Sequence, residues 1–233
     1  MRVQGDYLDK YQLQNQELVQ KTANKPIKLI LNIVLLGWFI LSLAPKVLES
    51  RADAYYRKSD YNNALVYYNI SALIDSKNPH VYFDRGLTYE KLEKYDLAMG
   101  DFSKAIDIDS LYPNAYVGRC YIYNLQENYD LAIIDCTKAI ELGTSEIKAY
   151  SNRGLAYLKK EEYNLAILDF TKILESKPDD PLTNCLLEAA YAKMGKYINA
   201  ISSLEKAVKL DSKNELSWCK SALENAKKGT STP

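Results

Sequence analysis

Apolar residues recur along most of the chain at helical spacing. In the segment 163–174, Tyr163, Ala166, Phe170 and Ile173 follow one another three or four positions apart, which is the spacing of one face of an α-helix. The polar residues 160–162 separate this segment from a second helical segment at 149–159. The pattern therefore predicts two helices joined by a short polar turn.

This two-helix pattern repeats every 34 residues without an insertion or deletion. Two tyrosine series and one alanine series have five members each and no exception: Tyr55, Tyr89, Tyr123, Tyr157 and Tyr191; Tyr61, Tyr95, Tyr129, Tyr163 and Tyr197; Ala64, Ala98, Ala132, Ala166 and Ala200. Proline, which is tolerated at the first position of a helix, occupies four of the five places that start a unit: Pro45, Pro79, Pro113 and Pro181, with Ile147 in the remaining place. A fixed period of this length is typical of a helical solenoid. The predicted units are 45–78, 79–112, 113–146, 147–180 and 181–214.

These residues resemble the tetratricopeptide-repeat family, whose 34-residue unit has small residues at positions eight, twenty and twenty-seven and large residues at positions eleven and twenty-four. Here the eighth positions are Ala52, Gly86, Cys120, Gly154 and Glu188, and the twenty-fourth are Tyr68, Phe102, Cys136, Phe170 and Leu204. Glu188, Cys136 and Ile173 depart from the family pattern. The resemblance implies an all-α fold, a right-handed α-solenoid of five helix–turn–helix units. It also implies a groove, lined by the first helix of each unit, that binds a protein or peptide partner.

The solenoid is expected to end in a capping helix at 215–228, which continues the repeat and carries Trp218. An open solenoid needs such a polar-backed end helix. The last residues, 229–233, are expected to fray.

The segment 27–44 is the most apolar part of the chain, with Lys28 as its only charged residue. A helix of this length spans about 27 Å, close to the ~30 Å hydrocarbon core of a bilayer. We expect a single transmembrane helix that follows a polar tail at 1–26. Two alternatives remain open: a buried core helix, and a signal peptide cleaved near Ser42 and Ala44.

The orientation of this membrane span is not fixed by the flanking charges. Lys21 and Lys25 precede the span and Lys28 lies at its edge, while four basic residues follow it within 46–58, so the positive-inside rule gives no bias. The chain has four cysteines, and their spacing indicates no paired design. Unpaired cysteines are typical of a reducing compartment, and we therefore favour a cytoplasmic location for the repeats.

Arginine and aspartate occur together in the units. The seventh position is Arg85, Arg119 and Arg153 in three units whose twenty-third position is aspartate, and in the fifth unit both are replaced, by Leu187 and Ser203. An arginine row could bind an acidic ligand. The matched loss of both residues favours instead an ion pair between the two helices of each unit.

Composition and motifs argue against catalysis. The chain has 30 basic and 30 acidic residues, so it lacks the positive field that nucleic-acid binding requires. His80 is the only histidine, and there is no glycine-rich phosphate loop and no Cys-x-x-Cys motif. We expect no enzyme activity, cofactor, metal site or small-molecule substrate.

The partner site is expected on the first helices. The family's groove positions place apolar residues in the middle of the groove: Phe83, Leu87, Val117, Tyr121, Leu125, Leu155 and Leu158. The carboxylate clamp that some relatives use needs lysine at the fifth position, and no unit has one. The sequence therefore predicts a membrane-anchored adaptor or scaffold with an apolar groove. The alternative is a structural accessory subunit or assembly factor of a larger membrane complex.

Overall fold

The computed structural model describes residues 44–143 and 147–196, together with the single residues Ile201, Glu205, Val208, Lys209, Cys219 and Lys227. Every secondary-structure element in this part of the chain is an α-helix. Residues 44–57 are helical. The following helices are α2 (Tyr61–Ile74), α3 (Pro79–Lys91), α4 (Tyr95–Ile108), α5 (Pro113–Leu125), α6 (Tyr129–Glu141), α7 (Ile147–Lys159), α8 (Tyr163–Ser176) and α9 (Pro181–Lys193).

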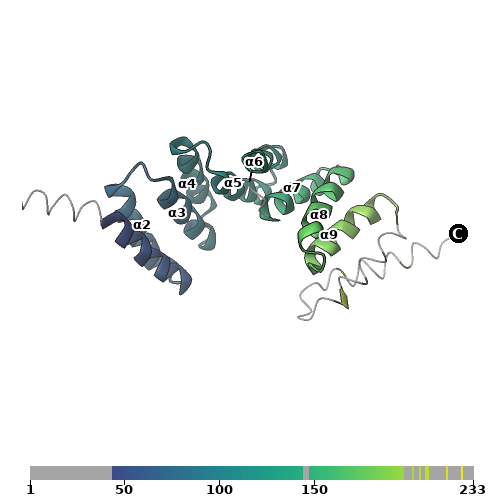
Figure 1. The fold of residues 1–233 in the computed structure, drawn as a ribbon, viewed down its shortest axis with the longest axis horizontal. Helices are drawn as coiled ribbons and strands as arrows, with labels where there is room; N and C mark the ends of the chain where they lie inside the picture. Colours follow the sequence, from purple (N-terminus) through teal and green to yellow (C-terminus); the bar gives the residue numbers. More distant parts are fainter. Residues whose placement is uncertain are drawn as a thin grey trace, which may run out of the picture.

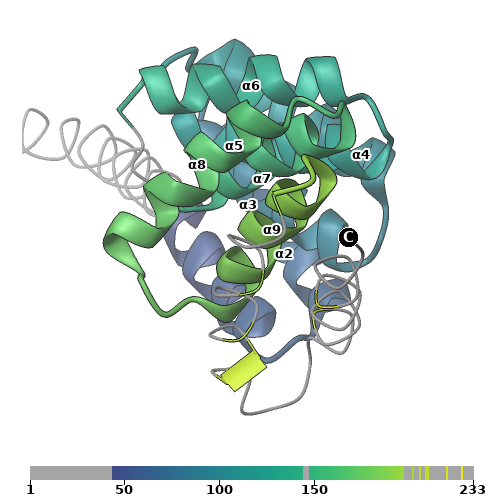
Figure 2. The ribbon, with the colours of Figure 1, turned by 90° about the vertical axis from the view of Figure 1, so that its right-hand side faces the viewer.

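The helices follow one another along the long axis of the molecule (Figure 1). Each helix packs against its neighbours in sequence, and the first helices of successive units, α3, α5, α7 and α9, also contact one another. In the view along this axis, α4, α6 and α8 lie towards the outside, and α3, α5 and α7 lie nearer the middle (Figure 2). The fold is thus the predicted all-helical solenoid. Helices α7 and α8 are longer than the sequence indicated, because the first turn at Ile147 and the last turn at Ser176 are also helical.

The same turn follows the first helix of every unit. The residue at its centre has a positive φ: Ser59, Glu93, Glu127, Glu161 and Gly195, each 34 residues after the last. One residue later, the backbone N–H donates to the carbonyl of the first tyrosine series, as Lys94 does to Tyr89 at 2.9 Å. This bond and the left-handed residue form the Schellman ending of a helix. The invariant period therefore reflects one backbone geometry repeated five times.

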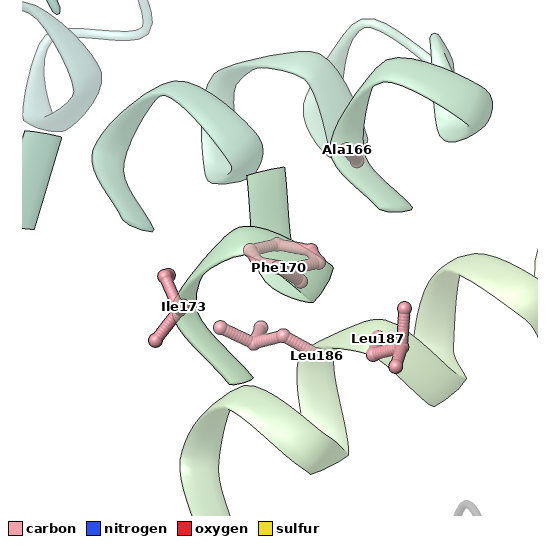
Figure 3. Close-up of a cluster of buried hydrophobic side chains, with 5 residues drawn as sticks. All are labelled: Ala166, Phe170, Ile173, Leu186 and Leu187. Carbon is pink, nitrogen blue, oxygen red and sulfur yellow. The ribbon is translucent and has the colours of Figure 1, made fainter. Parts of the chain in front are cut away.

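The small residues of the repeat have a packing role within each helix pair. A Cβ atom added to Gly86 would lie 2.7 Å from the ring of Phe102, and one added to Gly154 would lie 2.7 Å from the ring of Phe170. Such separations are shorter than any normal contact, so only glycine lets the two helices approach this closely. Phe170 sits fully buried with Ala166, Ile173, Leu186 and Leu187 between the fourth and fifth units (Figure 3).

The arginine and aspartate series form ion pairs. This was expected, because the fifth unit lacks both the arginine and the aspartate. Nitrogen–oxygen distances are 2.7 Å for Arg85–Asp101, 2.6 Å for Arg119–Asp135 and 2.7 Å for Arg153–Asp169. In the fifth unit the buried Leu187 takes the place of the arginine and packs in the apolar cluster of Phe170. The arginine row is therefore internal to the repeats, and its charge is not available for an acidic ligand.

The cysteine expectation was wrong. Cys120 in α5 is joined to Cys136 in α6, and Cys185 in α9 lies against Cys219, with the two Cα atoms 6.0 Å apart. For Cys120 and Cys136 the sequence argument failed because it considered only the spacing of the cysteines along the chain, whereas the eighth and twenty-fourth positions face each other within a unit.

Several predicted segments lie outside the described residues. They are the polar tail 1–26, the apolar span 27–44 except for Ala44, and the capping helix 215–228 except for Cys219 and Lys227. In the part of the chain that is described, no helix has the length and apolar character needed to cross a bilayer.

Candidate functional site

The first helices α3, α5 and α7 enclose a hollow of about 580 Å³, which we call the central hollow. Its lining is mixed and includes both apolar and polar side chains. The lining residues are Phe83, Leu87, Glu90, Lys91, Asn114, Val117, Gly118, Tyr121, Ile147, Lys148, Ser151 and Asn152. A volume of this size lies within the range of ligand-binding clefts.

Four of the predicted groove residues line the central hollow together: Phe83, Leu87, Val117 and Tyr121. They come from two successive first helices because the fifth and ninth positions of these helices face the same side. Phe83, Leu87 and Tyr121 are half-buried and pack against the cluster around Phe102, while Val117 is buried. Their inner surfaces stabilise the fold, and three of them also present surface to the hollow.

The other three predicted groove residues lie elsewhere. Leu125 is an exposed residue at the end of α5. Leu155 and Leu158 pack against the cluster around Phe170, and neither lines the central hollow. These two leucines therefore contribute to the packing between the fourth and fifth units.

Phe83 is held in place by aromatic contacts from both sides. Its ring centroid lies 5.8 Å from that of Phe102 and 5.4 Å from that of Tyr112. The Tyr112 hydroxyl in turn lies 3.0 Å from Nδ1 of His80. The one histidine of the chain thus belongs to an aromatic support of the groove that is formed within the second unit.

A second hollow, of about 310 Å³, adjoins the first at Leu87 and is acidic. Asp53, Tyr56, Arg57, Tyr68 and Asp84 complete its lining. We call it the acidic hollow. Sequence reasoning missed Asp84, because the sixth position is not one of the family's groove positions.

The carboxyl groups of the acidic hollow influence one another. Burial raises the pKa of Asp84 to about 7, and the nearby Asp53 and Glu49 carboxylates contribute to the shift. The Tyr68 hydroxyl donates a hydrogen bond to Asp53, and burial together with this bond raises the pKa of Tyr68. The hollow is therefore an environment in which a negative charge is poorly solvated and a positive charge would be stabilised.

The site offers binding surface and no evident catalytic arrangement. Among the described residues, no cluster of histidine, cysteine, aspartate or glutamate could hold a metal ion. The apolar surface of the central hollow suits an apolar side chain, and the adjoining carboxylates suit a cation. An extended protein segment carries both kinds of group along its length.

Comparison with known families identifies the repeats. Residues 79–110, 147–180 and 189–214 match family models described as tetratricopeptide repeat. These three segments thus match the tetratricopeptide repeat, which is the resemblance that the sequence indicated, and no catalytic family is indicated. No match was found among curated proteins.

Solved structures of three proteins share the fold. The crystal structure of MamA protein superposes with a TM-score of 0.65 at 22% identity, covering 74% of this chain and 94% of MamA. YrrB, described as a TPR protein with an unusual peptide-binding site, has a TM-score of 0.65 at 19% identity and covers 76% and 90% of the two chains. PilW, described as a type IV pilus biogenesis factor, has a TM-score of 0.66 at 20% identity and covers 71% and 77%. At these identities, the similarity establishes the solenoid fold alone.

Proposed function

We propose that the protein is a membrane-anchored adaptor that binds an extended protein segment in the central hollow. The central hollow carries the proposal, because Phe83, Leu87 and Tyr121 expose apolar surface there beyond what the packing of the helices uses. Exposed apolar surface in a concave site commonly marks a partner interface. The predicted apolar span at 27–44 would hold the groove at a membrane.

The chemistry of the two hollows defines the segment that fits. An apolar side chain of the partner occupies the central hollow, and a lysine or arginine next to it along the segment reaches Asp53 and Asp84. The apolar part supplies most of the affinity, so binding should weaken only modestly when salt is raised. Peptide binding by YrrB, as its description states it, is consistent with this use of the fold.

Site-specific photo-crosslinking tests the groove directly. A photo-reactive phenylalanine analogue replaces Tyr121 in the full-length protein in its native membranes, and the same analogue replaces Leu131 as the control. Leu131 is 45% exposed in α6 and does not line either hollow. The proposal expects a protein adduct at position 121 and none at position 131. Adducts at 131 alone would assign binding to the outer face of the solenoid.

The alternative is a structural accessory subunit whose groove is permanently filled. The repetition of one rigid unit and the description of PilW as a biogenesis factor are consistent with this role. Purification in mild detergent separates the two functions. An adaptor is recovered alone, and the Tyr121 adduct depends on the partner's concentration. A subunit is recovered with a stoichiometric partner that remains through successive columns.

A further inference from the structure

The disulfide of the third unit occupies a position that the other units use for tight packing. Cys120 and Cys136 stand where the second unit has Gly86 and Phe102 and the fourth has Gly154 and Phe170. The Cα atoms of the two cysteines are 5.6 Å apart, within the range that a disulfide requires. Both residues are fully buried. The bond therefore links α5 to α6 at the closest approach of the two helices.

Packing alone does not explain this pair of cysteines. A cysteine at position 136 replaces a phenylalanine ring that fills the space between units in the two neighbouring repeats. Two reduced thiols would leave part of that space without contacts, which costs stability. A covalent bond across the same gap holds the helices together without the ring.

The second pair is independent of the first. Cys185 and Cys219 lie one repeat period apart, both are fully buried, and their Cα atoms are 6.0 Å apart. This separation is within the range that a disulfide requires, and a bond here would join α9 to the region that follows the fifth unit. The two pairs use all four cysteines of the chain.

We propose that both disulfides are formed in the working protein and that the repeats face an oxidising, extracytoplasmic compartment. Pairing of every cysteine, at two separate packing sites, is typical of proteins that mature outside the reducing cytoplasm. This location replaces the cytoplasmic one that the sequence favoured on the assumption of unpaired cysteines. A retained membrane span and a cleaved leader are both compatible with it.

The bonds form by exchange with the disulfide of a thiol–disulfide oxidoreductase. One cysteine thiolate attacks that disulfide to give a mixed disulfide, and the second cysteine of the pair then displaces the oxidoreductase as its dithiol. Two thiols of this chain are oxidised, and one disulfide of the oxidoreductase is reduced. Because Cys120 and Cys136 are buried in the packed unit, this exchange takes place before α5 and α6 close together.

Thiol trapping in the cells that make the protein tests the proposal. Cells are lysed directly into denaturant with a maleimide–polyethylene glycol reagent, with or without prior reduction, and the full chain is followed by immunoblot. The expected result is no modified cysteine before reduction and four after it. Modification of any of the four before reduction overturns the proposal, and the same measurement on a known cytoplasmic protein controls for oxidation during lysis.

A variant that copies the packing of the neighbouring units measures the contribution of the Cys120–Cys136 bond separately from that of the Cys185–Cys219 pair. C120G/C136F introduces the glycine and phenylalanine that the second and fourth units use. Reduction should lower the melting temperature of the wild-type protein by about 5–10 °C more than that of the variant. An equal response of the two proteins to reduction overturns the role of Cys120–Cys136. If the variant does not fold, thiol trapping of the wild-type chain decides the question alone.

Discussion

Arg119 and Asp135 lie sixteen residues apart and form a two-point contact between α5 and α6. Nε of Arg119 donates to one carboxylate oxygen of Asp135 at 2.6 Å, and Nη2 of Arg119 donates to the other at 2.9 Å. The remaining guanidinium nitrogen donates to Ser103 in α4 at 3.2 Å. One side chain therefore connects three helices and two units. The carboxylate raises the pKa of the guanidinium through these hydrogen bonds, so Arg119 remains charged at neutral pH.

The arginines also account for part of the tyrosine content. The guanidinium carbon of Arg119 lies 5.8 Å from the ring centroid of Tyr116 and 6.0 Å from that of Tyr123. Arg153 has the same relationship to Tyr150 and Tyr157. A tyrosine ring attracts a cation through its face, and the tyrosine hydroxyl remains available to solvent or to a hydrogen-bond partner.

The first prediction concerns this ion pair. Replacing Arg119 by leucine leaves the Asp135 carboxylate, which is only 6% exposed, without its cation. Breaking such a pair should lower the free energy of unfolding by about 2–4 kcal/mol. Urea unfolding followed by circular dichroism measures the loss.

The double variant R119L/D135S is the matched control, because it copies the pair Leu187 and Ser203 of the fifth unit. It removes the buried charge together with its partner, so it should be more stable than R119L. A double variant that is less stable than R119L would contradict the view that the unpaired carboxylate causes the loss.

The second prediction concerns the close approach of α7 and α8. Gly154→Ala places a Cβ atom 2.7 Å from Cε1 of Phe170, which should cost about 1–3 kcal/mol of stability. Gly100→Ala in α4 is the control, since nothing lies within 4 Å of its added Cβ atom. Alanine favours a helix over glycine, so this second change should stabilise the protein by about 0.5–1 kcal/mol. Thermal melts of the two variants should therefore shift in opposite directions.

Most of the fold could be predicted from the sequence because each unit repeats the same local sequence signals for helices and turns. The proline starts, the polar turns and the Tyr, Ala and Phe positions all recur at one spacing, so an error in one unit is corrected by the others. The turn shows the limit of this reasoning. The positive φ of Glu93, Glu127 and Glu161 could not be predicted, because glutamate rarely adopts it. Only in the fifth unit is this turn residue a glycine, Gly195, which is typical of a positive φ.

The site was harder to predict because the position of a residue in the repeat does not show whether its side chain packs in the core or lines the groove. Leu155 occupies a ninth position, as Leu87 and Tyr121 do. It packs against the cluster around Phe170 and does not line the central hollow. The difference arises from the larger apolar neighbours in the fifth unit, Leu186 and Leu187. The Cys120–Cys136 disulfide was missed for a related reason: the contact between the eighth and twenty-fourth positions is a tertiary one.

The third prediction concerns the turns. Glu127 has a φ of 60°, in the left-handed region that a glycine adopts without strain and a side chain disfavours. Glu127→Gly should therefore stabilise the protein by about 0.5–1 kcal/mol, although glycine is normally destabilising. Glu93→Gly and Glu161→Gly should behave alike, and their effects should add because the turns share no contacts. A loss of stability in all three variants would show that the glutamate side chains stabilise the turns more than the backbone strain costs.

The fourth prediction concerns the pH dependence of the acidic hollow. Asp84 has a pKa of about 7 in the folded protein against an ordinary value of 3.8, first because of burial and then because of Asp53 and Glu49. Between about pH 4 and pH 7 the folded state holds a proton that the unfolded state has released. The contribution of Asp84 to stability is therefore present at low pH and is lost as the pH rises through this window.

Asp84→Asn removes this titration while preserving the shape of the side chain. At pH 8 the variant should be more stable than the wild-type protein by on the order of 2 kcal/mol, and near pH 4 the two should have nearly the same free energy of unfolding. Urea unfolding at pH 4, 6 and 8 measures the difference. Asp107→Asn, at an exposed position of α4, controls for the loss of one negative charge and should leave the slope with pH unchanged. If the wild-type protein and D84N have the same pH dependence, the Asp84 carboxyl titrates in its ordinary range, and the hollow is better solvated than its lining indicates.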